Sequence, residues 1–319
     1  MAALRLIRLP QWSKGVFVLV GPLYSVQDRP PEDPLGMALS VGATFILFGL
    51  VSSACYVFND LQDVQADRAH PRKRNRPIAS GAIAPAAAVR IAAGLLIAAA
   101  ATLVVLPGPA RWMVGGLAGL HLANVLTYSV FTKHRVILDV LSLSMGFVFR
   151  VLAGCAAALV EPSTWLLNVT LFLAMLLAFG KRLGERRTAE RADDPETTAA
   201  PSPPESGASA AASRGAAAYR RVQAGYSDEL LRMLVVVSGV ATLLTYAGYI
   251  QTRDDDYTYG FNLLWLTILP ATFGLLRAIA LLERGTYDDP TELATKDPPF
   301  QASALAFALL TAGVVALGG

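Results

Sequence analysis

Oxygen-bearing side chains recur at regular intervals in the segment 59–67. Asn59, Asp63 and Asp67 are spaced four residues apart. A helix turns once every ~3.6 residues, so this spacing would place the three side chains on one face over two turns. Carboxylates this close repel each other unless a cation lies among them, and Mg2+ prefers such oxygen ligands and often shares them with substrate phosphates. The spacing therefore predicts a Mg2+ site, with a solvated, charged helix end as the alternative.

The segment directly after these residues is strongly basic. Positive charge is expected in a cytoplasmic loop in any case, which explains the number of basic residues but not their position beside an acidic segment. Clustered Arg and Lys side chains next to metal ligands suit a diphosphate leaving group, because the charge that develops on it must be neutralised. The basic residues of this run are Arg68, His70, Arg72, Lys73, Arg74 and Arg76, and Pro77 follows them.

Further ionisable residues lie at the ends of apolar stretches or inside one. Lys14 precedes the first stretch, Lys133 lies between the fourth and fifth, and Lys181 and Arg182 end the sixth. Arg150 lies within the fifth, where an unpaired charge costs at least ~2.5 kcal/mol, so we expect it to face the interior of the protein and to have a partner. Lys133 and Lys181 are interpreted equally well as residues that snorkel to the membrane surface.

Other kinds of active site have no matching pattern in the sequence. The three histidines lack the spacing of a zinc site, and no Ser or Cys nucleophile stands with a candidate base. Glycine patterns that bind dinucleotides or nucleotide phosphates are absent as well, and no basic stripe interleaved with aromatic residues suggests nucleic acid as a partner. This inventory favours a reaction in which a metal assists the departure of diphosphate.

The composition indicates what must position these residues. Hydrophobic residues make up 54% of the 319 residues and charged residues only 16%, whereas a soluble domain carries roughly a quarter charged residues. Stretches of about 20 apolar residues are long enough to cross a bilayer as helices. We predict an all-α, polytopic membrane bundle of about nine transmembrane helices, at 15–27, 35–58, 85–106, 112–131, 136–160, 163–180, 230–250, 259–282 and 300–318.

The distribution of Lys and Arg predicts the orientation of the bundle. Most of the 27 basic residues fall in 1–14, 59–84, 132–135, 181–229 and 283–299, whereas the intervening loops hold only Arg29, Arg111 and Arg253. Positive charge marks the cytoplasmic side, so we expect the N-terminus inside, the C-terminus outside and the 59–84 loop in the cytoplasm. We expect no cleavable signal peptide. Cys55 and Cys155 fall within spans and are interpreted as small packing residues.

One segment differs in composition from the rest of the predicted single membrane domain, 1–319. Residues 186–218 are rich in Ala, Pro, Ser and charge and lack large apolar side chains. Such a segment buries too little apolar area to offset its ordering entropy, so we predict a disordered cytoplasmic insert. Asp193 and Asp194 within it are interpreted as solvated charges rather than as a second site.

Several motifs resemble those of a known family. Asn59-Asp60-x-x-Asp63-x-x-x-Asp67 after the second span resembles the UbiA superfamily of membrane prenyltransferases. The runs at 8–14, 59–81, 149–154, 179–185, 225–231 and 289–297 are similar to the decaprenyl-phosphate phosphoribosyltransferase branch of that superfamily. The HPRKRNRPI run and the GKR run carry the resemblance to the branch, whereas Gly15 and Leu183-Gly184 depart from its usual residues.

The resemblance implies a reaction between two phosphorylated substrates. The donor would be 5-phosphoribosyl diphosphate, and the acceptor a polyprenyl (decaprenyl) phosphate whose oxygen attacks the ribosyl C1 while Mg2+-diphosphate leaves. The product would serve the synthesis of lipid-linked arabinose donors for the cell wall. The resemblance also implies a bacterial inner-membrane protein with its active site facing the cytoplasm, and a homo-oligomer is possible.

The resemblance assigns roles to the candidate residues. Asn59, Asp63 and Asp67 would hold Mg2+ and the diphosphate, and Asp60 would shape the loop as a fourth catalytic residue. Lys73, Arg74 and Arg76 would contact the donor phosphates, with Arg68 and Lys133 beside them. Lys181, Arg182, Lys14 and Arg150 would contact the second phosphate.

Two other functions compete with this interpretation. The main alternative is a Mg2+-dependent prenyltransferase that moves a prenyl group from a prenyl diphosphate to an aromatic acceptor. Such relatives typically carry a second Asp-x-x-x-Asp motif after the sixth span, where this chain has Lys181-Arg182-Leu183-Gly184-Glu185. A transporter is the other alternative, but the sequence shows no inverted repeats or paired broken helices.

Overall fold

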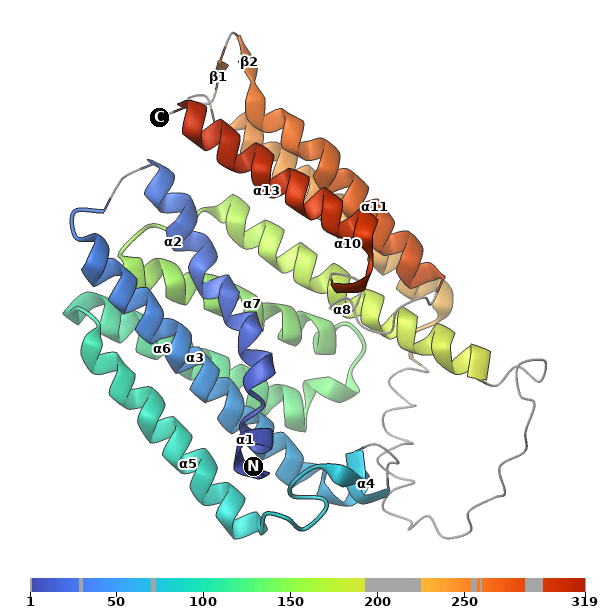
Figure 1. Ribbon diagram of the computed structural model, residues 1–319. Coiled ribbons are helices and arrows are strands. Elements are labelled where there is room, and N and C mark those ends of the chain that lie inside the picture. The colour runs from blue at the N-terminus through green and yellow to red at the C-terminus, as the bar shows by residue number, and fades with distance from the viewer. Residues whose placement is uncertain are drawn as a thin grey trace. The chain divides into compact units, whose positions relative to one another are not determined.

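The computed structural model describes residues 2–28, 31–69, 73–192, 225–253, 257–258, 260–284 and 295–318. The chain divides into two compact units, each with its own set of helices (Figure 1). Unit 1 comprises Met1–Ser163 and Pro204–Gly225, and unit 2 comprises Thr164–Pro203 and Tyr226–Gly319.

Unit 1 is a bundle of long helices with short helical segments at the ends. Helices α3 and α5 run side by side, and α1 and α4 lie at the same end of α3 (Figure 1). Its elements are α1 (Ala2–Ile7), η1 (Leu9–Val16), α2 (Phe17–Asp28), α3 (Pro34–Gln62), α4 (Val64–Ala69), η2 (Lys73–Asn75), α5 (Pro85–Thr102), η3 (Leu103–Val105), α6 (Gly108–Val130), η4 (Thr132–His134) and α7 (Leu138–Ala158).

The described part of unit 2 contains four α-helices, one 3-10 helix and one very short hairpin. The hairpin is antiparallel and pairs Tyr257 with Asn262. Its elements are α8 (Thr164–Ala192), α10 (Asp228–Gln251), β1 (Tyr257–Thr258), β2 (Phe261–Asn262), η7 (Leu263–Thr267), α11 (Ile268–Glu283) and α13 (Pro298–Gly318). Apart from this hairpin the described part of the chain has no strands, so the predicted all-α class is confirmed.

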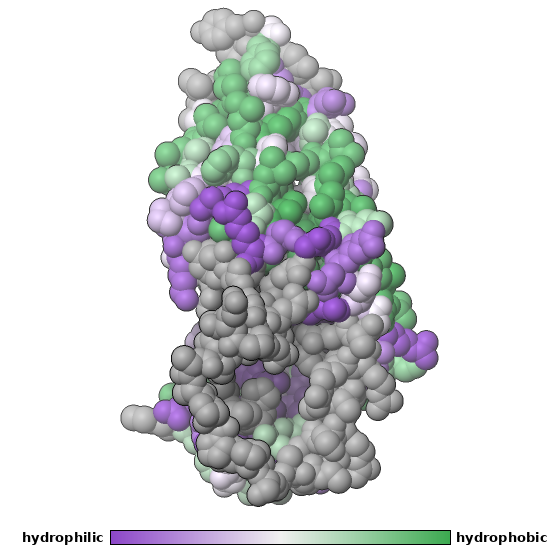
Figure 2. Space-filling model, turned by 90° about the vertical axis from the view of Figure 1, so that its right-hand side faces the viewer, coloured by the Kyte–Doolittle hydropathy of each residue, from purple (hydrophilic) through white to green (hydrophobic). Residues whose placement is uncertain are grey.

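The surfaces of these helices are those of a membrane protein. Within the described residues, seven helices are long and apolar enough to cross a bilayer. Large apolar side chains point outward from them, and Trp112, Val104 and Ile97 are 80%, 72% and 71% exposed. Soluble proteins rarely expose so much apolar surface. Figure 2 shows hydrophobic residues covering one stretch of the face it presents and hydrophilic residues gathered in a band next to it.

Two of the nine predicted spans differ from the other seven. The segment predicted at 15–27 contains α2, which has only 12 residues and includes Pro22. The segment predicted at 300–318 lies in α13, whose apolar part Pro298–Val314 is shorter than the seven long spans. The count of nine and the N-in, C-out orientation therefore stay predictions.

The ends of the long helices follow from local sequence. Asp33 caps α3 by accepting a hydrogen bond from the Gly36 amide at 2.9 Å, and Pro34 occupies the first turn. Ser227 caps α10 through the Leu230 amide at 3.1 Å. These residue types satisfy amides that a helix start leaves without partners.

Helix α8 is longer than the sequence predicts. It continues to Ala192, so residues 186–192 of the predicted disordered insert are helical. Within unit 2, Arg186 Nε contacts Asp228 Oδ1 at 2.8 Å and its Nη1 donates to the Tyr226 carbonyl. The remainder of the predicted insert, 193–218 with Asp193 and Asp194, lies outside the described residues.

Candidate active site

The helix that carries the oxygen-bearing residues is interrupted in the middle of their sequence. Helix α3 ends at Gln62, Asp63 forms its cap with φ −97° and ψ 8°, and α4 begins at Val64. The expectation of one continuous helix face is therefore wrong. Backbone hydrogen bonds between residues four positions apart nevertheless continue across the break. The Asp63 amide donates to the Asn59 carbonyl at 3.0 Å, and the Asp67 amide donates to the Asp63 carbonyl at 2.8 Å. Asp is prone to such interruptions because its side chain competes for nearby backbone groups.

The break separates a buried carboxylate from an accessible one. The Asp67 side chain is only 4% exposed, whereas that of Asp63 is 46% exposed. Asp60, which the sequence placed in a supporting role, is also buried, at 2%. The end of α3 thus has two carboxylates inside the protein and one facing solvent.

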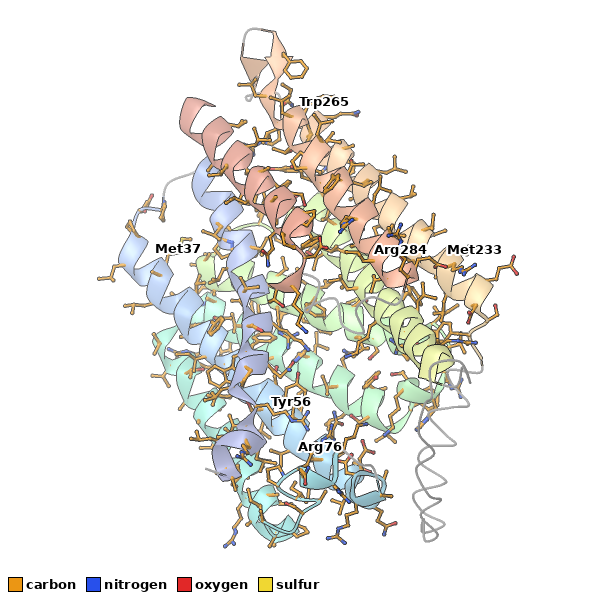
Figure 3. All side chains as sticks on the ribbon, turned by 45° about the vertical axis from the view of Figure 1, so that its right-hand side comes forward. Met37, Tyr56, Arg76, Met233, Trp265 and Arg284 are labelled. Atoms are coloured by element: carbon orange, nitrogen blue, oxygen red, sulfur yellow. The ribbon has the colours of Figure 1, made fainter. Side chains whose placement is uncertain are left out.

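Arg76 connects the two buried carboxylates. Its Nη1 lies 3.1 Å from Asp60 Oδ1 and 2.8 Å from Asp67 Oδ2. One guanidinium thereby joins the end of α3, the short helix α4 and the loop that follows η2. Figure 3 labels Arg76 close to Tyr56 at this end of α3, and Met37 at the opposite end.

Arg8 supplies a second cation to Asp60. Its Nη2 lies 2.5 Å from Asp60 Oδ1, and its guanidinium lies 5.0 Å from the centre of the Tyr56 ring. The Arg8 backbone is left-handed, with φ 55° and ψ 49°, a conformation that non-glycine residues seldom adopt. Arg8 begins one of the runs that resemble the family, but no local pattern in the sequence indicated a role for it.

The N-terminal segment is attached to α3 by further contacts. Trp12 Nε1 donates to Ser53 Oγ at 3.0 Å, and Ser53 Oγ lies 2.7 Å from the Ile7 carbonyl. The Trp12 ring lies so close to Gly49 that an added Cβ would come within 2.6 Å of it. Glycine permits this close approach, so η1 packs directly on α3 and brings Arg8 to the site.

Helix α6 and the turn after it form another side of the site. Ser129 Oγ contacts Asn59 Oδ1, and Lys133 Nζ lies 3.5 Å from Asp63 Oδ1. Ser129 is buried, and nothing in its sequence context identified it. Each of the three predicted metal ligands therefore has a polar partner from another segment.

Apolar packing holds the loop with Arg76 in place. Leu6, Val57, Ile78 and Ala88 form a buried cluster, each at most 1% exposed. They come from α1, α3, the loop after η2 and α5, so the cluster joins all the segments that carry Arg8, Asp60 and Arg76.

The buried carboxylates of the site depend on nearby positive charge. Burial raises the pKa of the Asp67 carboxyl above its ordinary value, and the nearby Arg76 guanidinium opposes that rise. Asp60 Oδ2 is buried and has no hydrogen-bond partner in the described part of the chain. Buried carboxylates are stable as anions only when cations or donors surround them, and at this site Arg8 and Arg76 provide that charge.

The other predicted basic residues of the N-terminal segment and of the run 68–76 differ in their surroundings. Lys73 and Arg74 in η2 are exposed to solvent. Arg68 Nε instead donates to the Ala79 carbonyl at 3.1 Å and so anchors the loop. Lys14 is partly buried in η1. His70 and Arg72 lie outside the described residues.

The remaining predicted residues belong to helices α7 and α8. Arg150 lies in α7, only 7% exposed, and faces the interior of unit 1 as expected. Lys181 and Arg182 belong to α8 of unit 2, and Arg182 Nη1 donates to the Ala178 carbonyl at 3.1 Å.

A divalent metal fits the donor set, provided that other ligands complete it. Among the described residues no three His, Cys, Asp or Glu side chains gather as a metal site. Asn59, Asp63 and Asp67 together offer one amide and two carboxylate oxygens, which are hard ligands. Mg2+ is commonly held by one or two carboxylates, with waters and substrate phosphates filling the other positions. The side chains present are sufficient for such a shared site.

Sequence comparison yields relatives that match the chain from end to end. A decaprenyl-phosphate phosphoribosyltransferase of Mycolicibacterium smegmatis is 32% identical over 313 residues, 95% of this chain and 89% of the relative. A protein of the same name from Mycobacterium tuberculosis is 30% identical over 315 residues, 98% of this chain and 93% of the relative.

Structural comparison gives the same fold at much lower identity. A UbiA homolog from Archaeoglobus fulgidus, solved with DMAPP and Mg2+, has a TM-score of 0.64 at 16% identity and covers 99% of both chains. The profile of the UbiA prenyltransferase family matches residues 15–294. The chain therefore belongs to the UbiA prenyltransferase family.

Proposed function

We propose that the protein transfers the 5-phosphoribosyl group from 5-phosphoribosyl diphosphate to a polyprenyl phosphate and releases diphosphate. The relatives matched over nearly their whole length carry the name of this reaction, with decaprenyl phosphate as acceptor. The product would be a lipid-linked phosphoribose, which a bacterial cell can use for arabinose donors in wall synthesis. The reaction would take place at the cytoplasmic side of the inner membrane.

The observation that carries the proposal is the bridge from Asp60 through Arg76 to Asp67. It places the Asp60 and Asp67 carboxylates each within 3.1 Å of the Arg76 guanidinium, at the end of a spanning helix. Carboxylates at this place suit a metal, and guanidinium groups suit phosphate oxygens through paired hydrogen bonds. A diphosphate needs both kinds of group, whereas a solvated helix end needs neither.

Residues of the chain have distinct tasks in this reaction. Asn59, Asp63 and Asp67 would hold Mg2+, which when bound neutralises charge on the departing diphosphate. Lys73 and Arg74 are exposed beside the site and would bind the donor phosphates. Arg8 and Asp60 would keep Arg76 in position. A phosphate monoester is already anionic at neutral pH, so its oxygen can form the bond to C1 without a general base.

Two observations favour this reaction over prenyl transfer to an aromatic acceptor. The chain has Lys181-Arg182-Leu183-Gly184-Glu185 where such prenyltransferases typically carry a second Asp-x-x-x-Asp motif. The relatives named as phosphoribosyltransferases match nearly the whole chain.

The test is diphosphate release by the purified protein with 5-phosphoribosyl diphosphate and Mg2+. We expect release that depends on added polyprenyl phosphate and stops with EDTA. The control reaction tests the alternative function and contains a prenyl diphosphate and 4-hydroxybenzoate in place of these substrates. We expect no diphosphate release in this control. Turnover in the second mixture alone would contradict the proposal.

A further inference from the structure

The hydroxyl group of Ser129 has two acceptors next to it and a single hydrogen to donate. Its Oγ lies 2.8 Å from the Val125 carbonyl, one turn back in α6, and it also contacts Asn59 Oδ1 of α3. A serine hydroxyl carries one hydrogen, so it can donate fully to only one of these oxygens. With the Asn59 oxygen on this side, one of the two contacts joins two oxygens without a hydrogen of its own.

The carboxamide of Asn59 can remove this conflict, because it can turn about its last bond. A half-turn exchanges Oδ1 and Nδ2, two atoms of nearly the same size whose assignment depends on their hydrogen-bond partners. Ser129 would then donate to the Val125 carbonyl, as serines inside helices often do, and would accept from Asn59 Nδ2. Ser53 Oγ also lies near two carbonyls, but both belong to the backbone and cannot turn, so it has to share its hydrogen.

Another pair of asparagine and serine in unit 1 has no such conflict. Asn124 Nδ2 in α6 donates to the Ser142 carbonyl of α7 at 2.8 Å, and Ser142 Oγ donates to Asn124 Oδ1 at 2.9 Å. There a backbone carbonyl fixes the orientation of the carboxamide, and the hydroxyl group follows it. At Ser129 the order is reversed. The Val125 carbonyl takes the hydroxyl hydrogen, and the hydroxyl oxygen then fixes the carboxamide.

Burial makes Ser129 the partner that decides this orientation. Ser129 is 4% exposed, whereas Asn59 is only partly buried. Water therefore has little access to the side of the carboxamide that faces the serine, and a polar group there needs a protein partner. The nitrogen and the oxygen of a carboxamide point in different directions from the same carbon. With Nδ2 held by Ser129, Oδ1 is the atom left for a ligand.

We propose that Ser129 is a positioning residue that makes Asn59 present its oxygen, and not its nitrogen, to the divalent metal. The inference rests on the proposed function only in that Asn59, Asp63 and Asp67 hold this metal. The two carboxylates each have two equivalent oxygens, so Asn59 is the one ligand of the three whose ends differ. Its oxygen is a hard ligand, whereas its NH2 group would direct hydrogens at the cation. Groups that orient a metal ligand in this way increase metal affinity.

The experiment measures metal binding and does not depend on turnover. The purified protein is titrated with Mn2+, which binds the same oxygen ligands as Mg2+, and the free ion is followed by its electron paramagnetic resonance signal. Ser129→Ala removes the partner of Asn59, and we expect the affinity for Mn2+ to fall about tenfold. Ser129→Thr keeps the hydroxyl group and should stay within about twofold of the wild type. Ser142→Ala is the matched control, because it removes a buried hydroxyl group from Asn124, and we expect it to leave the affinity unchanged.

A second background separates orientation of the ligand from support of the fold. Asn59→Asp gives this position two equivalent oxygens, so its orientation no longer matters. In the Asn59→Asp protein, adding Ser129→Ala should therefore change the affinity for Mn2+ less than about twofold. Melting temperatures without metal verify that each variant folds. If Ser129→Ala does not fold, Ser129→Cys keeps the volume and weakens the hydrogen bond, and we expect an intermediate loss of affinity.

Two outcomes would overturn the inference. An equal loss of Mn2+ affinity in the Asn59 and Asn59→Asp backgrounds would show that Ser129 only supports the fold of the site. Unchanged affinity in folded Ser129→Ala would show that Asn59 is oriented by other groups. Failure of the proposed function looks different: the wild type would release no diphosphate from 5-phosphoribosyl diphosphate, while Mn2+ binding would still depend on Ser129.

Discussion

The end of α3 and the turn around Ser52 in the same helix differ in how their buried charges are balanced. At the end of the helix, Asp60 and Asp67 are neutralised by Arg8 and Arg76 from other segments. Around Ser52 the single charge of Arg150 meets only neutral partners among the described residues, the Gly146 carbonyl and Ser52 Oγ. One helix therefore carries a charge-balanced region and an unbalanced one, about 10 Å apart.

This difference indicates how each region would take its ligand. In the balanced region a Mg2+-diphosphate can replace existing pairs, because it supplies cations to the carboxylates and anions to the arginines. The unbalanced region has no pair to exchange, so the second phosphate that the family resemblance assigns to Arg150 would add directly to it. The following substitutions test this difference between the two regions.

The largest expected effect comes from the carboxylates of the balanced region. Asp67→Asn and Asp63→Asn each remove one charge and keep the shape of the side chain. Loss of such an electrostatic contact lowers the rate about a hundred- to thousandfold. Turnover measured over a Mg2+ titration, with circular dichroism to verify folding, is the measurement. Near-normal rates at limiting Mg2+ would show that these carboxylates form only a solvated helix end.

The next effect concerns stability. Arg76→Gln leaves Asp60 and Asp67 buried with less positive charge around them. Breaking a buried ion pair costs about 3–5 kcal/mol, and because Arg76 is 29% exposed we expect about 2 kcal/mol here. Thermal unfolding in detergent should show a clearly lower melting temperature.

Arg150→Gln is the comparison for that measurement, since it removes a charge without stranding a carboxylate. We expect it to keep, or slightly raise, the melting temperature of the unliganded protein. A fall as large as that of Arg76→Gln would remove the distinction between the two regions.

A smaller effect is expected at the exposed edge of the balanced region. Arg74 is exposed. Arg74→Ala would remove a paired contact to a donor phosphate, and we expect the KM for the donor to rise about tenfold. Steady-state kinetics with each substrate varied in turn measure it. Arg90→Ala, at an exposed position of α5, serves as the control.

The smallest effect is expected from the segment outside both regions. Deletion of 193–213 removes no large apolar side chain, so activity should change less than about twofold. Asp193→Asn should have no effect for the same reason. A folded deletion variant that lost most of its activity would show that this segment contributes to the site.

Much of the site follows from local sequence alone. The spacing of Asn59, Asp63 and Asp67 and the basic run after them are visible within 20 residues, and the apolar stretches predict the helices that carry them. These features depend on helix periodicity and membrane thickness, which act locally. The interior position of Arg150 followed from the cost of a charge in a span.

The tertiary pairings could not be derived in this way. Arg8 reaches Asp60 across 52 positions of sequence, and Ser129 reaches Asn59 across 70. Nothing in the residue types specifies these partners, because many arginines and serines would be chemically suitable. The break at Asp63 was missed for a related reason: regular spacing favoured a continuous helix, while the buried pairs of Asp60 and Asp67 with Arg76 orient α4 separately.

The N-terminal segment attached to α3 gives the site an order of assembly during synthesis. Arg8 is synthesised before Asp60, so the cation that pairs with this buried carboxylate is already part of the chain when Asp60 leaves the ribosome. Arg76 follows 16 residues after Asp60 and joins it to Asp67. Ser129 and Lys133 arrive last, with α6, and complete the partners of Asn59 and Asp63. A nascent chain that is truncated at its start would insert the same helices, but would bring Asp60 into the membrane interface without its first counter-charge.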